Sequence, residues 1–166
     1  NKPVTLRTLD IGSDKEVSEN MKVGQIAKNP ALGLRGIRYS LYEKNLFKVQ
    51  IKAMLRAAKN GKLRILIPMI TTLDEINKAK RLIDEAKVEL VKEKKSFNHK
   101  YEVGIMIEVP ASAIQSNVLS KYVDFMSIGT NDLVQYILAI DRIDDEVTSL
   151  YDPTNPAVLQ LSLIHI

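Results

Sequence analysis

The sequence predicts an α/β fold, a partial TIM (β/α)8 barrel of about four βα units. Short apolar, β-branched runs alternate with amphipathic helical patterns along the chain, which is the order expected of parallel strands joined by helices. The runs carry apolar residues on both faces, as parallel strands buried between helices do. Several runs end in ionisable residues, and barrel enzymes place their reactive groups at the C-terminal ends of the strands.

The four expected strands are short and apolar. They are Val4–Leu9, Leu63–Met69, Val103–Val109 and Val123–Ile128. A polar, irregular stretch, Ser13–Asn29, follows the first of them. A loop of that length inside a compact domain is usually functional, so we expect it near the site.

Capping patterns and apolar spacing predict the two long helices. Ser40 with Glu43 forms a capping box that opens a helix to about Lys59, and Thr72 with Glu75 opens the next. Their expected buried faces are Phe47, Ile51, Leu55 and Ala58 in the first helix and Ile76, Ala79, Ile83, Ala86 and Leu90 in the second. The shorter elements expected are a turn over Pro30–Arg35 and helices over Ala111–Ser120, Asp132–Ile140 and Pro156–Ile164.

Chain length leaves two architectures open. A closed eight-stranded barrel needs about 250 residues, so 166 residues make about half a barrel or a small open doubly wound sheet. A doubly wound sheet binds its ligand only where the strand order reverses. Here the first, third and fourth strands all end in charged residues, which favours the barrel. Since the chain does not begin with Met, we expect it to be part of a longer protein.

The composition excludes several classes of function. Lys and Arg number 24 against 20 Asp and Glu, and the excess lies mostly in Lys78–Lys100, where a solvated helix face explains it better than a nucleic-acid site. The absence of cysteine excludes disulfides and thiolate metal sites. No signal peptide or transmembrane run is present, so we expect a cytoplasmic protein with no membrane and no nucleic-acid partner.

Two carboxylates follow the third and fourth strands. Glu108 and Asp132, completed by waters and substrate oxygens, would suit Mg²⁺, a hard cation that dehydrates reluctantly. The alternative is that each carboxylate caps the helix that follows it, and Asp132 is well placed to do so. Gly129-Thr-Asn131-Asp132 also opens a helix, where backbone N–H groups receive phosphate or carboxylate oxygens, although the same residues are ordinary in a βα turn.

Four basic residues are candidates for binding an anion. Arg gives planar, bidentate contacts to phosphate and carboxylate, whereas Lys acts as a point charge. The candidates are Arg7, Lys15, Arg35 and Arg142. Arg7 lies within an apolar strand and needs a partner there, either Asp10 or a ligand phosphate, while Arg35 could equally be a surface residue. Together with the carboxylates, these residues predict a phosphorylated carboxylate bound with Mg²⁺.

At these positions the sequence resembles a known family. It is similar to Enzyme I of the bacterial phosphoenolpyruvate:sugar phosphotransferase system, in the phosphoenolpyruvate-binding barrel of that enzyme. The resemblance covers most of the chain, and the motif after the fourth strand is long and specific. The matching stretches are Leu6–Lys15, Asn29–Arg38, Pro68–Ile70, Gly104–Ala111 and Asp124–Tyr136, which continues into Ala139–Arg142.

The resemblance implies a role for each site residue. Glu108 and Asp132 match the Mg²⁺ ligands, and Asp132 also borders the substrate. Arg7 and Arg142 match arginines that hold the phosphate of phosphoenolpyruvate, and Asn131 matches the asparagine that orients the substrate beside the metal. We therefore expect Arg7, Asn131 and Arg142 to be catalytic. Lys15 and Arg35 match further positive residues of the substrate pocket.

The implied reaction transfers the phosphoryl group of phosphoenolpyruvate to a protein histidine, which leaves pyruvate and starts sugar uptake. The implied partners are the histidine-containing phosphocarrier protein, bound through domains absent from residues 1–166, and a second copy of the full-length protein. A fragment of pyruvate phosphate dikinase or phosphoenolpyruvate synthase, which share this barrel, and a non-catalytic barrel module are the alternatives.

Several departures from the family pattern predict that this chain alone is inactive. The family protonates the enolate with a cysteine on a later strand, and this sequence has no cysteine. Ser13 stands where the family usually has Gly, and the last residues, from Ser162, do not resemble the continuing helix. Half a barrel also exposes strand edges, which are templates for pairing. We therefore expect the isolated chain to be marginally stable or to self-associate.

Overall fold

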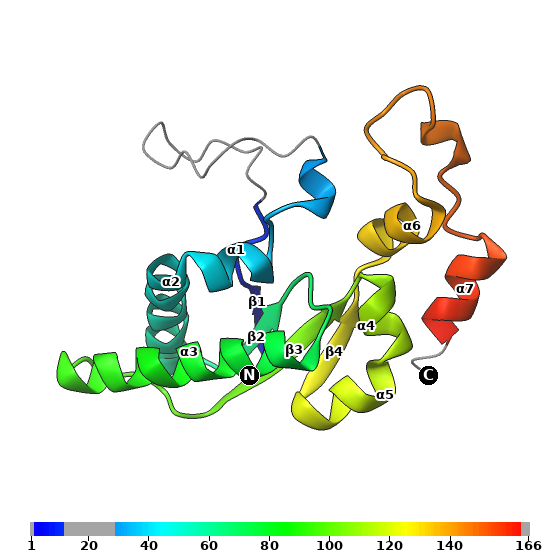
Figure 1. Ribbon diagram of the computed structural model, residues 1–166. Coiled ribbons are helices and arrows are strands. Elements are labelled where there is room, and N and C mark those ends of the chain that lie inside the picture. Colours follow the sequence, from blue (N-terminus) through cyan, green and yellow to red (C-terminus); the bar gives the residue numbers. More distant parts are fainter. Residues whose placement is uncertain (1, 12–28, 164–166) are drawn as a thin grey trace.

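The four predicted strands form one parallel sheet. A computed structural model describes residues 2–11 and 29–163. In it, β1 (Val4–Arg7), β2 (Leu63–Ile67), β3 (Tyr101–Ile107) and β4 (Phe125–Ile128) are neighbours in sequence order, and every pairing is parallel (Figure 1). The α/β class and the parallel strands are thus confirmed, while closure into a TIM barrel stays a prediction. Most of the loop Ser13–Asn29, with Lys15, lies outside the described residues.

The capping box predicted at Ser40 is wrong, whereas the one at Thr72 is confirmed. Ser40 lies buried within α1 (Ile37–Tyr42), and its amide donates to the carbonyl of Gly36. Gly36 has a φ of 56°, a conformation that glycine adopts without strain, and this lets the helix begin earlier than the local pattern suggests. Glu43 then separates α1 from α2 (Lys44–Ala57) instead of completing a cap.

The helix α3 (Leu73–Lys92) begins as the sequence predicts. The Thr72 hydroxyl accepts from the amide of Glu75 at 3.3 Å, and the Glu75 carboxylate accepts from the amide of Thr72 at 2.9 Å. The remaining helices are α4 (Pro110–Ile114), α5 (Ser116–Leu119), α6 (Thr130–Leu138) and α7 (Pro156–Leu163), with short 3-10 turns η1 (Pro30–Leu32), η2 (Ala58–Asn60), η3 (Ser120–Tyr122) and η4 (Thr148–Leu150). No helix in the described ranges is long and apolar enough to cross a membrane.

The main core lies between the long helices and one face of the sheet. Every residue predicted for the buried faces of the two long helices is buried, with Met54 and Leu82 in addition. These side chains pack with the aliphatic residues of β2 and β3 in one cluster. Because each fully buried aliphatic side chain contributes about 2 kcal/mol, this packing fixes the sheet and with it the ends of the strands.

The opposite face of the sheet is more polar. Arg64 and Glu102 are register partners on β2 and β3, and the Arg64 Nε donates to the Glu102 carboxylate at 2.6 Å. The Arg64 guanidinium also lies 5.3 Å from the centre of the Phe125 ring. Phe125 in turn covers Gly104, where an added Cβ would lie 2.6 Å from ring atoms.

Candidate functional site

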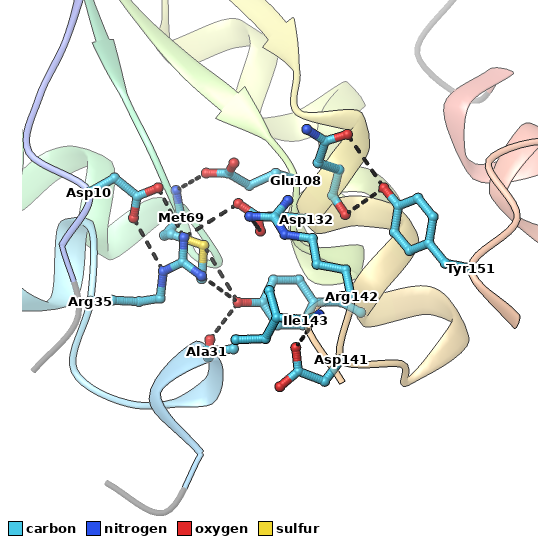
Figure 2. A network of polar contacts seen from close by, with 12 residues as sticks. Asp10, Ala31, Arg35, Met69, Glu108, Asp132, Asp141, Arg142, Ile143 and Tyr151 are labelled. Atoms are coloured by element: carbon cyan, nitrogen blue, oxygen red, sulfur yellow. Dashed lines mark hydrogen bonds and ion pairs between the residues drawn. The ribbon is translucent and has the colours of Figure 1, made fainter. Parts of the chain in front are cut away.

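Three carboxyl groups meet at the C-terminal edge of the sheet. Asp10 follows β1, Glu108 directly follows β3, and Asp132 lies in the first turn of α6, after β4. One oxygen from each lies within 4.8 Å of the other two, and Figure 2 shows the side chains converging. Parallel strands end at the same edge, so residues far apart in the sequence come together here.

Glu108 is buried and held by a backbone amide. Glu108 is only 1% exposed, and its Oε1 accepts a hydrogen bond from the amide of Met69 at 2.6 Å. Met69 follows β2 with a φ of 61°, which is rare for a residue with a side chain and marks a constrained site. Burial raises the pKa of Glu108 to about 7, and the charges of Asp132 and Asp10 add to the effect.

Asp132 faces the cluster and does not cap α6. The N-cap of α6 is Gly129, and in the described part of the chain no side chain caps that helix. Asp132 Oδ2 accepts from Arg35 at 3.4 Å, whereas Oδ1 is buried with no hydrogen-bond partner among the described residues. Within the described ranges, the cation paired with Oδ1 is Arg142, at 3.6 Å. A buried, unsatisfied carboxylate oxygen is costly, and a bound cation would remove that cost.

Arg35 ties two of the three carboxylates together. Its Nε donates to Asp10 Oδ1 at 3.3 Å and its Nη2 to Asp10 Oδ2 at 3.0 Å, a bidentate contact, and Nη2 also reaches Asp132. The side chain is 14% exposed, so the surface alternative for Arg35 is wrong. Although burial opposes it, the hydrogen bond and charge of Asp10, with that of Asp132, raise the pKa of Arg35 above its ordinary value.

Two further arginines lie at the rim of the cluster. Arg7 is the last residue of β1 and is exposed, so it lies at the end of the strand and not within it as the sequence predicted. Its Nη1 donates to Asp10 at 3.2 Å, the partner that the sequence suggested. Arg142 is also largely exposed, with 41% of its side chain accessible. In their contacts with the described residues, both guanidinium groups leave donors for an incoming anion.

The turn between β4 and α6 lies directly against Glu108. A Cβ at Gly129 would lie 2.7 Å from Glu108 Cβ and 2.8 Å from its Oε2, so the backbone approaches this closely because the residue is glycine. In the same turn, the exposed Asn131 accepts from the Tyr151 hydroxyl through its backbone oxygen, at 3.3 Å, and its Oδ1, at 3.4 Å.

Sequence reasoning missed two residues of this site. It treated Asp10 only as a partner of Arg7, although Asp10 follows a strand end in the same way as Glu108 does. It did not single out Tyr136, whose hydroxyl contacts Arg35 at 3.5 Å. Tyr136 lies one helical turn after Asp132, and that spacing is the signal that places both on one face of α6.

The donor set fits a hard divalent cation. Carboxylate oxygens are the ligands that Mg²⁺ prefers, and the cluster offers them from three separate elements. Asp132, one of these three carboxylates, has a buried Oδ1 with no hydrogen-bond partner among the described residues. Glu108 and Asp132, with Asp10 beside them, could therefore hold such an ion, and the rim arginines could hold an anion bound to it.

Comparisons with known proteins find relatives over nearly the whole chain. The sequence pattern of the family described as "PEP-utilising enzyme, PEP-binding domain" matches residues 1–165. A phosphoenolpyruvate-protein phosphotransferase of Mycoplasma capricolum is 48% identical over 158 residues, which are 95% of this chain and 27% of that protein. Those of Latilactobacillus sakei and Bacillus subtilis are each 46% identical over 160 residues, 96% of this chain and 28% of theirs. The chain thus spans little more than a quarter of these relatives.

Proposed function

The chain belongs to the family of PEP-binding domains of PEP-utilising enzymes, which confirms the resemblance drawn from its motifs, and on this premise we propose that it binds phosphoenolpyruvate with Mg²⁺ at the carboxylate cluster. The proposed reaction of the whole protein moves the phosphoryl group of phosphoenolpyruvate to a protein histidine. The names of the relatives favour this over the dikinase and synthase alternatives.

One observation supports the proposal above the others. At the strand ends lies a buried carboxylate cluster with an unsatisfied oxygen, and arginines surround it. Glu108 and Asp132 would hold Mg²⁺, which when bound supplies charge neutralisation between phosphate and carboxylate oxygens. Arg7 and Arg142 would bind the phosphate from the rim. Asn131 would orient the substrate, and Lys15 would add positive charge from the segment outside the described residues.

The work of these residues would be positioning and charge neutralisation. Phosphoryl transfer passes through a loose transition state with charge spread over three oxygens, and fixed guanidinium donors stabilise that charge. Arg35 keeps Asp10 and Asp132 in place through its three contacts with them. The leaving enolate needs a proton, and the family's cysteine does not occur in these 166 residues. We propose that this step uses a group outside the chain described here.

The remaining parts of the proposal concern the whole protein. We propose that further βα units complete the barrel beside the outer strands of the sheet. From the resemblance to Enzyme I, we propose that a phosphohistidine domain elsewhere in the whole protein receives the phosphoryl group. The proposed partners are the histidine-containing phosphocarrier protein and a second copy of the full-length protein.

Calorimetric titration of phosphoenolpyruvate into the chain, with and without Mg²⁺, tests the proposal. We expect binding that requires Mg²⁺ and that Asp132→Asn abolishes while the far-ultraviolet circular dichroism stays unchanged. Asp84→Asn is the matched control, because Asp84 lies exposed on α3 and, among the described residues, pairs with Lys87 alone. Metal-independent binding, or binding that survives in Asp132→Asn, would refute the assignment of the carboxylates.

A further inference from the structure

The hydroxyl of Tyr136 joins three parts of the chain: α6, the segment from Ala31 to Arg35, and Met69. It donates to the carbonyl of Ala31 in η1, and it lies 3.5 Å from Arg35 Nη1 and 3.9 Å from Met69 Sδ. Tyr136 itself belongs to α6, the helix that carries Asp132. Figure 2 shows three of the residues that this hydroxyl contacts, Ala31, Arg35 and Met69, beside the carboxylate cluster.

The contact with η1 matters because η1 leads directly to Arg35. Only two residues separate Leu32, the last residue of η1, from Arg35. Gly36, which follows Arg35, lies so close to Met69 that an added Cβ would be 2.7 Å from the Met69 side chain. The Tyr136 hydroxyl therefore holds both the start of this segment, at Ala31, and the guanidinium at its end. Burial raises the pKa of Tyr136 above its ordinary value, so the hydroxyl keeps its proton and remains a donor at neutral pH.

From this arrangement we propose that Tyr136 is a positioning residue that locks the Arg35 guanidinium between Asp10 and Asp132. The inference deepens the proposed function and rests on it. A locked Arg35 has two opposite effects on binding. It occupies carboxylate oxygens that a cation would use, which weakens the binding of metal alone. It also lowers the negative charge that an entering phosphate and carboxylate would meet, which strengthens binding of the anion.

Removal of the hydroxyl should consequently shift the two affinities in opposite directions. For Tyr136→Phe, we expect the dissociation constant of phosphoenolpyruvate, measured with saturating Mg²⁺, to rise about fivefold, as for the loss of one hydrogen bond. The dissociation constant of Mn²⁺ alone, measured by electron paramagnetic resonance, should fall about twofold, the size of a weak ion pair. A merely structural role would weaken both, because a destabilised site binds neither ligand well.

Two further variants separate positioning from damage to the fold. Ala31→Gly leaves the hydroxyl in place but loosens the turn to which it donates, so the same two shifts should appear at smaller size, even if Tyr136→Phe does not fold. In an Arg35→Lys background, Tyr136→Phe should add nothing to either constant, because the group that it positions is gone. Tyr122→Phe is the matched control. Tyr122 lies in η3, which precedes β4, so it is at the opposite end of that strand from the carboxylate cluster.

The outcomes distinguish this inference from the proposed function. Opposite shifts in Tyr136→Phe and Ala31→Gly, lost in the Arg35→Lys background, would establish the positioning role. Unchanged constants, or a parallel loss of both affinities, would overturn the inference while leaving the proposed function intact. Failure of the unsubstituted chain to bind either Mn²⁺ or phosphoenolpyruvate would overturn the proposed function and this inference with it.

Discussion

Replacement of Gly129 by alanine should damage the site from the backbone side. The φ of Gly129 is −95°, which any residue adopts, so the effect is purely steric. The added methyl group would lie 2.7 Å from Glu108 Cβ, 2.8 Å from Glu108 Oε2 and 3.0 Å from Met106 Sδ. Glu108 cannot retreat freely, because its other oxygen is held by the amide of Met69 at 2.6 Å.

The magnitude follows from this crowding. An inserted methyl group that forces neighbours to shift typically costs about 1–3 kcal/mol, which corresponds to a decrease in melting temperature of roughly 2–10 °C for a chain of this size. Because Glu108 must move, we also expect Mn²⁺ affinity to fall about tenfold or more, the size reported for disturbed metal-ligand support.

Gly61→Ala is the matched control for this experiment. An added Cβ at Gly61 meets nothing within 4 Å, and the backbone there is extended. The same substitution should therefore be neutral or stabilise by about 0.4–1 kcal/mol, through the unfolded state. Thermal unfolding and Mn²⁺ titration of the two variants provide the measurement. A Gly129→Ala variant as stable and as tight in metal binding as Gly61→Ala would refute the packing argument.

Two other predictions concern charge and capping. Because burial raises the pKa of Glu108 to about 7, its contribution to the stability of the metal-free chain is fully present below about pH 4.5 and is lost as the pH rises through about 7. Urea unfolding in the presence of a chelator measures this effect. Between about pH 5.5 and about pH 8, the free energy of unfolding of the unsubstituted chain should fall by on the order of 2 kcal/mol more than that of Glu108→Gln. Equal decreases in the two proteins would contradict this prediction. Thr72→Ala removes the hydroxyl that accepts from the amide of Glu75 and should cost about 1 kcal/mol in the same assay. Asn77→Ala, an exposed change on the same helix, should cost nothing measurable, and an equal loss in both would show that the cap is unimportant.

The fold was predictable wherever neighbouring residues decide the structure. Apolar runs gave the four strands, and the spacing of Phe47, Ile51 and Leu55 gave a helix face that is buried as expected. The capping box at Thr72 formed because both partners lie at a free helix start. At Ser40 the same pattern was misleading, since the positive φ of Gly36 starts the helix one turn earlier and packing buries Ser40 inside it.

The site was predictable only in part, because its geometry depends on long-range contacts. The pattern of carboxylates at strand ends was enough to predict Glu108 and Asp132. The third carboxylate, Asp10, joins them only through the sequential order of the strands, which no local pattern specifies. Tyr136 acquires its contacts when η1 folds back onto α6, and this depends on packing between segments far apart in the chain.

The charges of the site also favour an order in which its two ligands bind. Asp10, Glu108 and Asp132 bring three carboxyl groups together, while Arg35 already engages two of them. A phosphorylated carboxylate entering alone would meet these groups and gain little, since like charges repel. Under the proposed function, a cation held by Glu108 and Asp132 would neutralise part of this negative charge and lower that repulsion. Arg142, at the rim beside Asp132, would then face an anion with less repulsion behind it, so the arrangement favours binding of the metal first.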